Sequence, residues 1–281
     1  MKNEGKMEVK MQKEEQKNYL SAGELIRFGI DCIDETVSFR SLKSEQQEEV
    51  SFSSLGISFN SGELSVLSSK NVCDNSSFTL NLLNDVTVKL GLPAAYFSIG
   101  SIDYENIVYN LLAMNTKVHL GKIRGAHIDM EHFEKIKEAA GSLYNANFSV
   151  FYSEEISPKE YATTVRKIYS ENKIKFLIID INTDGLMFNT PEQIKDLIFK
   201  SREFSEELNI PILLSLEEKD RKKLKKLLSM VTTQSIFLTR DQKRVDYASP
   251  IINSQIQIVR GKEKMVRKLK YNTCTRVVGL D

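Results

Sequence analysis

Short, continuously apolar segments alternate with longer segments of helical periodicity through most of the chain, and this alternation constrains the fold more than any other feature. The apolar segments are Leu64–Leu67, Ala94–Gly100, Phe148–Tyr152, Phe176–Asp180, Pro211–Leu216 and Ile236–Leu238. Strands that are apolar on both sides belong to parallel sheets with both faces covered. The sequence therefore predicts an α/β fold with a mainly parallel, twisted sheet and helices on both faces.

Helices are expected between these strands, and their first residues are of types that stabilise helix N-termini. Asp103 precedes one helix, and Pro158 lies in the first turn of another. The predicted helices begin near Asp74 and Asp103 or cover Met130–Leu143, Ser157–Glu171 and Thr190–Leu208.

The last part of the chain has a different pattern. Short β-prone runs at Ile256–Arg260, Met265–Tyr271 and Arg276–Val278 are separated by Gly261-Lys262-Glu263 and by Asn272. Turn residues between such runs are typical of hairpins. We therefore expect antiparallel hairpin strands at the C-terminal edge of the sheet.

The first residues differ from the rest in composition. Residues 1–18 mix lysine and glutamate without an apolar core, which predicts a disordered tail. Residues 19–60 predict an amphipathic linker helix from Tyr19 to Val37, capped by Ser21, and then a connector rich in serine, glutamate and glutamine. The apolar stripe of this helix packs either on its own domain or on a neighbouring subunit. Residues 61–281 are expected to form the α/β domain.

The overall charge and the cysteine count exclude several classes of protein. A net charge of +1 gives no global attraction to nucleic acid or to a membrane. The 3 cysteines are odd in number and form no CxxC pair, which favours a reducing cytoplasm. No run approaches the ~20 apolar residues of a membrane span. The spacing of His119, His127 and His132 matches no metal-ligand pattern, so no metal site is predicted.

The stretch Gly62–Leu82 reads as a strand, a polar turn from Ser68 to Cys73 and a helix, which is where a phosphate-binding loop would lie. In the pattern GxxxxGK[ST], glycine lets backbone N–H groups close on phosphates, lysine neutralises their charge, and the hydroxyl binds magnesium. The four positions are occupied here by Ser69, Asp74, Asn75 and Ser76. Asp, Asn and Ser also cap helices, so an ordinary capped turn is the alternative.

Taken together, the segments from Ser61 to Leu280 resemble the C-terminal motor domain of the DnaB-like bacterial replicative helicases. GELSVLSSKNVCDNSSFTLNLLNDVTVKLGLPAAYFSIGS is similar to the family's first strand, phosphate loop, helix and second strand. The segment from Lys122 to Ile181 resembles its following helices and Walker B strand, and NIPILLSLEE its next strand. The resemblance implies a RecA-like fold that, in the family, forms a six-membered ring, binds ATP between subunits and moves on single-stranded DNA.

The departures from the family fall on its working residues. Asp74 and Asn75 stand at the positions of the loop's glycine and lysine. Two like charges ~4 Å apart repel by about 4 kcal/mol at an effective dielectric of ~20, so a carboxylate here opposes phosphate binding. Gly100 stands where the family has the glutamate that positions the attacking water. The resemblance therefore implies that no catalytic residue is intact.

Other positions keep part of the family's pattern. By resemblance, Asp180 matches the Walker B aspartate and Glu217 the polar residue that senses the γ-phosphate; Asp180 is otherwise a polar residue ending a buried strand. The predicted nucleotide-binding remnant is Ser69, Lys70, Asp74, Asn75, Ser76, Asp180 and Glu217. Arg260 and Lys262 match the family's finger pair, although lysine fits a phosphate less well than arginine does.

A basic cluster follows the strand at Pro211–Leu216 within the predicted amphipathic segment Glu217–Met230. Its members are Lys219, Arg221, Lys222, Lys223, Lys225 and Lys226. Such a helix either tracks the phosphates of DNA or forms a solvated face.

Three functions remain open from the sequence. The favoured one is a degenerate motor domain without ATPase activity and without a cofactor. It would act as a structural or regulatory protein in DNA replication or mobile-element maintenance, with a replicative helicase or copies of itself as partner. The second is a divergent ATP-dependent DNA helicase that binds ATP and magnesium, with Lys70 replacing the lost lysine. The third is a single-stranded DNA-binding module without a motor. In each case we expect a cytoplasmic protein without a membrane partner.

Overall fold

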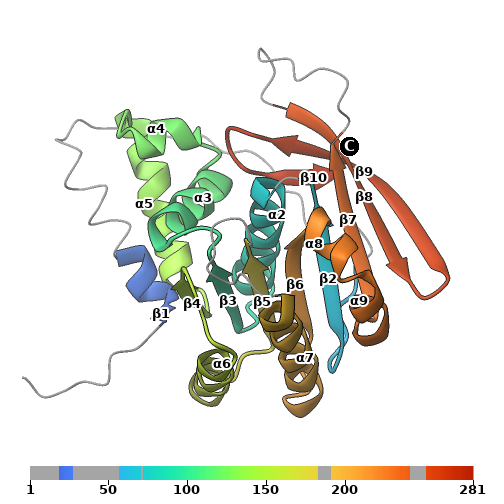
Figure 1. The fold of residues 1–281 in the computed structure, drawn as a ribbon. Helices are drawn as coiled ribbons and strands as arrows, with labels where there is room; N and C mark the ends of the chain where they lie inside the picture. The colour runs from blue at the N-terminus through green and yellow to red at the C-terminus, as the bar shows by residue number, and fades with distance from the viewer. Residues whose placement is uncertain (1–18, 28–56, 71, 183–190, 241–250, 281) are drawn as a thin grey trace, which may run out of the picture.

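All strands of the described residues belong to one twisted sheet. The computed structural model describes residues 19–27, 57–70, 72–182, 191–240 and 251–280 (Figure 1). The strand order is β1-β4-β3-β5-β6-β2-β7-β8-β9-β10. The mutually parallel strands are β2 (Leu64–Ser69), β3 (Ala94–Ile99), β4 (Phe148–Ser153), β5 (Phe176–Ile181), β6 (Ile212–Glu217) and β7 (Gln234–Arg240). They coincide with the apolar segments of the sequence, so the prediction of a mainly parallel sheet is confirmed.

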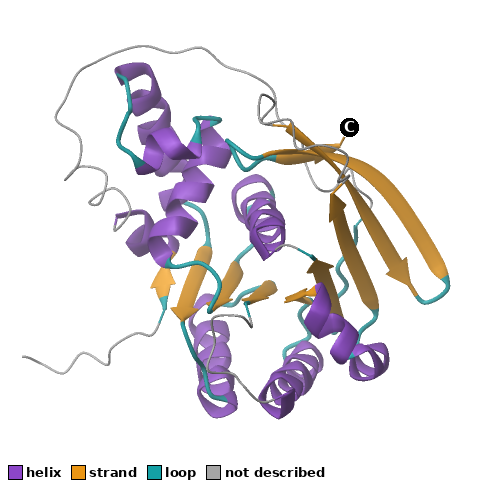
Figure 2. Cartoon of the chain, turned by 45° about the horizontal axis from the view of Figure 1, so that its top comes forward, coloured by secondary structure: helices purple, strands orange, loops and turns teal. Residues whose placement is uncertain are grey.

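Helices cover both faces of this sheet (Figure 2). One face carries α2 (Val72–Asn84), its π-helical continuation η2 (Asp85–Lys89), α3 (Tyr104–Thr116), α4 (Leu120–Arg124) and α5 (Met130–Tyr144). The other carries α6 (Pro158–Asn172), α7 (Pro191–Glu207), α8 (Glu218–Lys223) and α9 (Lys225–Val231). No described helix combines the length and apolar composition needed to span a bilayer.

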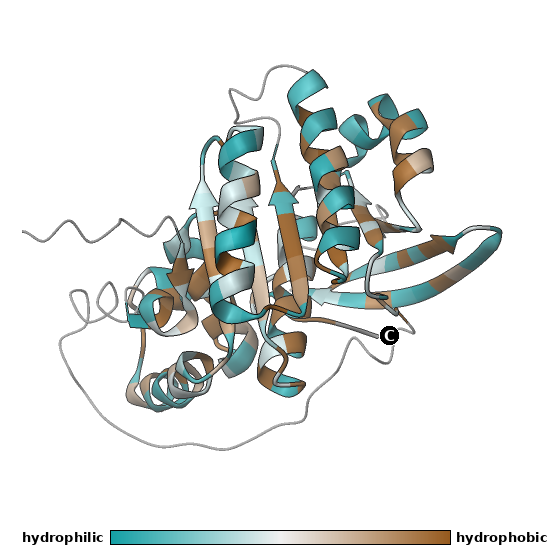
Figure 3. Cartoon of the chain, turned by 90° about the horizontal axis from the view of Figure 1, so that it is seen from below, coloured by the Kyte–Doolittle hydropathy of each residue, from teal (hydrophilic) through white to brown (hydrophobic). Residues whose placement is uncertain are grey.

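Alternation along the central strands divides the core into two apolar layers. Tyr96 and Ile178 pack on the α2 side, whereas their neighbours Phe97 and Ile179 pack on the α6 side. All four side chains are fully buried. In Figure 3 the middle strands are largely brown, while the flanking helices are striped teal and brown. Alternate residues of each continuous apolar run thus pack into the two different layers of the core.

The predicted helix starts have the expected caps. The Asp103 carboxylate accepts a hydrogen bond from the backbone N–H of Asn106 at 2.8 Å, and the Ser157 hydroxyl accepts one from that of Glu160 at 3.2 Å. Both satisfy an amide that the helix leaves without an internal partner.

The predicted helix over Tyr19–Val37 needs correction at its start. Leu20–Ser21 form a short strand, β1, antiparallel to β4, and the helix begins at residue 22. The strand forms because β4 would otherwise leave an unpaired edge here. Ser21 still caps the helix: its hydroxyl accepts a hydrogen bond from the backbone N–H of Glu24 at 3.4 Å, and its own N–H donates to the Glu24 carboxylate at 2.9 Å. Leu25 and Ile26 are buried against this chain's own core, and the rest of the predicted helix lies outside the described residues.

The antiparallel C-terminal edge is confirmed. β8 (Ile251–Arg260) pairs with β7 and forms a long hairpin with β9 (Glu263–Asn272), which extends past the helices in Figure 1. The last strand, β10 (Val278–Leu280), begins two residues later than predicted. Arg276 has a φ of 61°, which no strand tolerates, and the Asn272 side chain accepts two turn amides before it.

The predicted single helix over Glu217–Met230 is also wrong in part. Glu217 ends β6, and two short helices, α8 and α9, follow with a break at Leu224. The break allows both Leu224 and Leu228 to be buried against the α7 side of the core.

Candidate functional site

The predicted site residues gather at the carboxyl ends of the central strands, the usual position of binding sites in parallel α/β sheets. Ser76 lies in the first half of α2, and its hydroxyl donates to Oδ2 of Asp180, near the end of β5, at 2.6 Å. The neighbouring Ser101 hydroxyl donates to the same oxygen at 2.9 Å. The structure therefore brings together the two residues that stand at the positions of the family's magnesium-binding hydroxyl and Walker B aspartate.

Asp180 lies in a closed, polar pocket of the core. Its side chain is 0% exposed, and the Tyr96 hydroxyl donates to Oδ2 at 2.9 Å. Burial, and then the Asp180 charge, hold the pKa of the Tyr96 phenol well above its usual value, so this group stays a proton donor. Oδ1 of Asp180 has no hydrogen-bond partner among the described residues. Three hydroxyls thus donate hydrogen bonds to one carboxylate oxygen, while the other oxygen has no partner in the described part of the chain.

The carboxylate of Asp74 is engaged by an arginine that the sequence did not single out. Arg240, the last residue of β7, donates its Nε to Oδ2 of Asp74 at 2.6 Å and its Nη2 to Oδ1. The side chains are 12% exposed for Asp74 and 28% for Arg240. The guanidinium also lies 5.8 Å from the Tyr271 ring centroid. Asp74 sits in the first turn of α2, where the helix dipole favours a negative charge.

Asn75, at the position of the loop lysine, is a structural residue of the core. It is 1% exposed, and its Nδ2 donates to the backbone oxygen of Leu216 at 2.9 Å. This bond ties α2 to the end of β6.

The connection between β2 and α2 is shorter than the sequence suggested. The turn was expected to run from Ser68 to Cys73, but β2 continues to Ser69 and α2 begins at Val72. Early helix formation is favoured because Asp74 stabilises the first turn. Lys70 follows β2 and is exposed. Gly100, at the end of β3, has a φ of 58° and donates its N–H to the Ser153 oxygen at 2.9 Å.

The remaining nucleotide-site candidates lie apart from this centre or make other contacts. Glu217 pairs with Lys219 at 2.9 Å at the end of β6. Arg260, at the end of β8, contacts the Glu63 carboxylate of its own chain and the Ser58 hydroxyl. Lys262 is exposed in the hairpin turn.

The basic cluster on α8 and α9 is partly neutralised. Three of its cations lie within 4 Å of a carboxylate on the same helix: Arg221–Glu218 3.9 Å, Lys222–Glu218 3.5 Å and Lys223–Asp220 3.7 Å. The Arg221 guanidinium also covers the Phe237 ring at 4.4 Å. Lys225 and Lys226 are exposed, with no ion pair to another described residue. Contact of this cluster with DNA stays a prediction.

The histidines serve local structure. His119 caps α4 by accepting the Gly121 amide at 2.9 Å, and His132 lies 2.6 Å from Asp129. Within the described part of the chain, no three His, Cys, Asp or Glu side chains come close enough together to hold a metal ion.

Sequence reasoning missed Arg240, Ser101 and Tyr96. Ser101 and Arg240 follow the ends of predicted strands, and strands that end at one edge bring such side chains together. Tyr96 carries a hydroxyl within the largely apolar run Ala94–Gly100, which was the available signal. No sequence signal pointed to Arg240, because its partner Asp74 is 166 residues away in the sequence.

Two comparisons concern sequence. The family model described as "DnaB-like helicase C terminal domain" matches residues 51–244. The replicative DNA helicase DnaB of Nostoc is 21% identical over 159 residues, which cover 55% of this chain and 18% of that protein. The replicative DNA helicase DnaC of Bacillus subtilis is 21% identical over 160 residues, which cover 55% of this chain and 35% of that protein. This chain thus spans well under half the length of these relatives.

The third comparison concerns structure. A solved ATPase domain aligns with a TM-score of 0.68 at 14% identity and covers 91% of this chain and 98% of that domain. A DnaB-like replicative helicase, solved in a study of its interactions with primase, aligns with a TM-score of 0.66 at 13% identity, over 89% of this chain and 66% of that one. These likenesses confirm the RecA-like fold. Because the family model matches more than half of its length, this chain belongs to the DnaB-like helicase C-terminal domain family.

Proposed function

We propose that this chain is a degenerate motor domain of the DnaB-like family that does not hydrolyse ATP and acts as a structural or regulatory protein in DNA replication or mobile-element maintenance. The observation that carries the proposal is the ion pair between Asp74 and Arg240. Helix N-termini bind phosphate because their amides and dipole attract an anion. At the first turn of α2 the carboxylate of Asp74 takes the place of such an anion.

Electrostatics at this turn oppose a nucleotide. Without its cation, the Asp74 carboxylate would repel a phosphate charge ~4 Å away by about 4 kcal/mol at an effective dielectric of ~20. Arg240 offsets this repulsion as long as it stays bonded to Asp74. Asn75 stands at the position of the lysine that offsets phosphate charge in the family. Its amide nitrogen already donates to the backbone oxygen of Leu216. Arg240 is a compensating cation at this turn, but it is bonded to Asp74. A nucleotide would have to break the ion pair before gaining a cation.

The residues present do not fit Mg·ATP. The cavity beside Asp74 and Arg240 measures about 20 Å³, room for about one water. Gly100 has no side chain to orient an attacking water. We therefore expect neither nucleotide binding nor turnover.

One observation favours the second function, a divergent ATP-dependent helicase. Asp180 keeps its hydrogen bond to Ser76, and Oδ1 of Asp180 has no hydrogen-bond partner in the described part of the chain. Lys70 is exposed and follows β2 directly, so it is the available replacement for the lost lysine. This alternative requires saturable, magnesium-dependent nucleotide binding.

A scaffold role needs partners, and we propose a replicative helicase or further copies of this chain. The fold offers the family's surfaces, although Arg260 is held by Glu63 of its own chain. Light scattering with and without the host's replicative helicase tests this role. A complex of larger mass supports a regulatory partner, and unchanged masses for both proteins contradict it.

ATP turnover tests the loss of catalysis. Phosphate release should equal the buffer blank, with an active DnaB-family helicase as the positive control. Turnover above the blank that disappears in Asp180→Ala would end the proposal. Because the Asp180 side chain is buried, a thermal melt must accompany this variant to show that it is folded.

A further inference from the structure

The β8–β9 hairpin has an open edge. β9 pairs with β8 along its whole length, but its outer edge pairs with β10 only from Leu269 to Tyr271. Arg260 and Glu263 form the pair next to a two-residue turn, so odd-numbered residues of β9 exchange hydrogen bonds with β8. The backbone groups of Lys264, Val266 and Lys268 therefore point outward, without a partner strand among the described residues.

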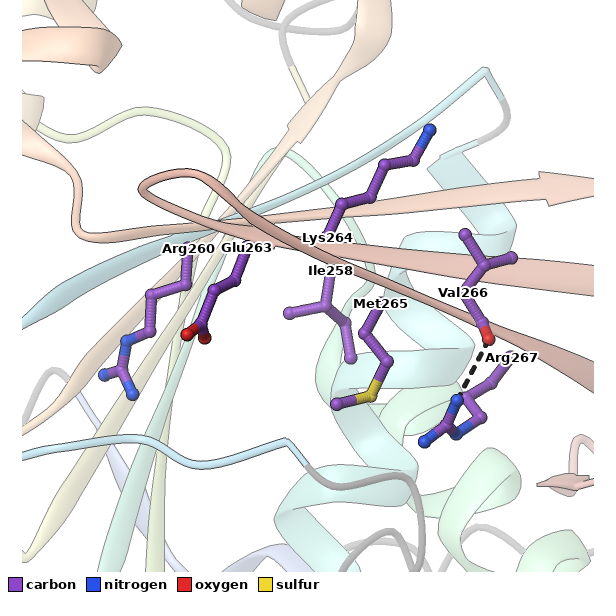
Figure 4. Close-up of a pocket in the computed structure, with 7 residues that line it drawn as sticks. All are labelled: Ile258, Arg260, Glu263, Lys264, Met265, Val266 and Arg267. Atoms are coloured by element: carbon purple, nitrogen blue, oxygen red, sulfur yellow. Dashed lines mark hydrogen bonds between the residues drawn. The ribbon is translucent and has the colours of Figure 1, made fainter.

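One face of this edge is basic and polar. Lys264 and Lys268 are exposed and form no ion pair with another described residue, and Val266 between them is 45% exposed. In Figure 4 the side chains of Lys264 and Val266 lie on one side of the hairpin. The nearest acid on the strand, Glu263, points to the other side. Lysines on an edge strand hinder its pairing with most other strands. A strand with acidic side chains is the one whose charges would offset them.

The opposite face of the same edge borders a hollow that is partly apolar and partly charged. The hollow measures about 360 Å³ and is lined by Ile258, Arg260, Glu263, Lys264, Met265, Val266 and Arg267. Figure 4 shows the Ile258 and Met265 side chains next to each other on this side. A strand added to β9 would place every second side chain toward this hollow and the others toward the lysines.

We propose that an extended acidic segment of a partner protein, with alternating apolar and acidic residues, adds to the sheet along Lys264, Val266 and Lys268. Its backbone pairs with β9, its acidic side chains face the lysines, and its apolar side chains enter the hollow beside Met265. Main-chain pairing with alternate side-chain pockets is an established mode of peptide recognition. This proposal does not depend on the loss of ATPase activity.

Like charges argue against one other occupant of this edge, and the lack of exposed aromatic rings argues against a second. Antiparallel pairing of two copies about Val266 sets Lys264 against Lys268 of the second copy, and like charges opposite each other destabilise a sheet. Single-stranded nucleic acid is held by stacking on exposed aromatic rings. The only aromatic residue in 251–272 is Tyr271, which is 4% exposed.

The probe is a fluorescent peptide of alternating glutamate and valine, titrated into the full chain. We expect saturable binding that weakens about tenfold in Val266→Pro, because proline removes one outward N–H donor. Proline is tolerated on an edge strand, and this N–H makes no bond to β8. Val266→Thr keeps the donor and the branched side chain, and should bind as the wild type does.

A charge control separates the edge from general attraction. Lys264→Glu with Lys268→Glu should abolish binding of the peptide. Lys225→Glu with Lys226→Glu makes the same change in net charge on α9 and should leave binding intact. Absence of binding to the wild type, equal binding to Val266→Pro, or displacement of the peptide by oligo-dT would each overturn the proposal.

Amide hydrogen exchange gives a readout that needs no variant. In the free chain the amides of Lys264, Val266 and Lys268 should exchange fast, and those of Met265 and Arg267, bonded to β8, should exchange slowly. Saturating peptide should slow the first set and leave the second unchanged. Slowing of neither set contradicts strand addition.

Discussion

Replacement of Arg240 by leucine tests the ion pair on which the proposed function rests. Leucine keeps an apolar side chain at this position but leaves the Asp74 carboxylate without its cation. Breaking a fully buried pair costs about 3–5 kcal/mol. The Arg240 side chain is 28% exposed and that of Asp74 is 12% exposed, so solvent screens part of the interaction between the two charges. We therefore expect Arg240→Leu to lower the free energy of unfolding by about 2–3 kcal/mol.

Urea unfolding at neutral pH, followed by far-ultraviolet circular dichroism, measures this loss. The double variant Asp74→Asn with Arg240→Leu removes both charges and should recover most of the stability, with a coupling energy above about 1 kcal/mol.

Arg166→Leu is the matched control. Arg166 makes a similar two-pronged contact with Glu207 and lies 5.0 Å from the Phe204 ring centroid, but this pair is exposed. The decrease in the free energy of unfolding caused by Arg166→Leu should be far smaller than that caused by Arg240→Leu. Equal losses in Arg166→Leu and Arg240→Leu, or a double variant no more stable than Arg240→Leu, would refute the reasoning.

Two further predictions concern stability. Asn75→Ala should cost about 1–3 kcal/mol in urea unfolding, because the buried Leu216 oxygen loses its donor; a loss below about 0.5 kcal/mol would contradict the assigned role. The His132 backbone N–H, and to a lesser degree the His132 side chain, hold the pKa of Asp129 below its usual value. A carboxyl with a lowered folded pKa adds stability above its unfolded pKa and loses it as the pH falls through the folded value. An NMR titration should therefore place the Asp129 midpoint below that of an unstructured aspartate, and Asp129→Asn should flatten the acid limb of the stability curve; an ordinary midpoint would count against the cap.

The fold was predictable because its signals are local. Each parallel strand is a continuous apolar run, and caps such as Asp103 and Ser157 mark helix starts within a few residues. The prediction errors arose where tertiary contacts, rather than the local sequence, determine the secondary structure. Leu20–Ser21 became a strand because β4 offered an edge, and the helix after β6 broke at Leu224 so that two leucines could reach the core.

The site was predictable only in part. Position in the loop pattern located Asp74, Asn75 and Ser76, and the end of an apolar run located Asp180. The partner of Asp74 could not be inferred, because Arg240 reaches it through the pairing of β7 with β2 rather than through any sequence spacing. The sequence suggested an uncompensated acid, whereas the structure has a compensated one.

Calorimetric titration of the full chain with Mg·ATP tests the central claim most directly, with a DnaB-family helicase as the positive control. The ion pair of Asp74 with Arg240 and the loss of the loop lysine predict no saturable heat of binding. Saturable, magnesium-dependent binding that is lost in a folded Asp180→Ala variant would contradict the account.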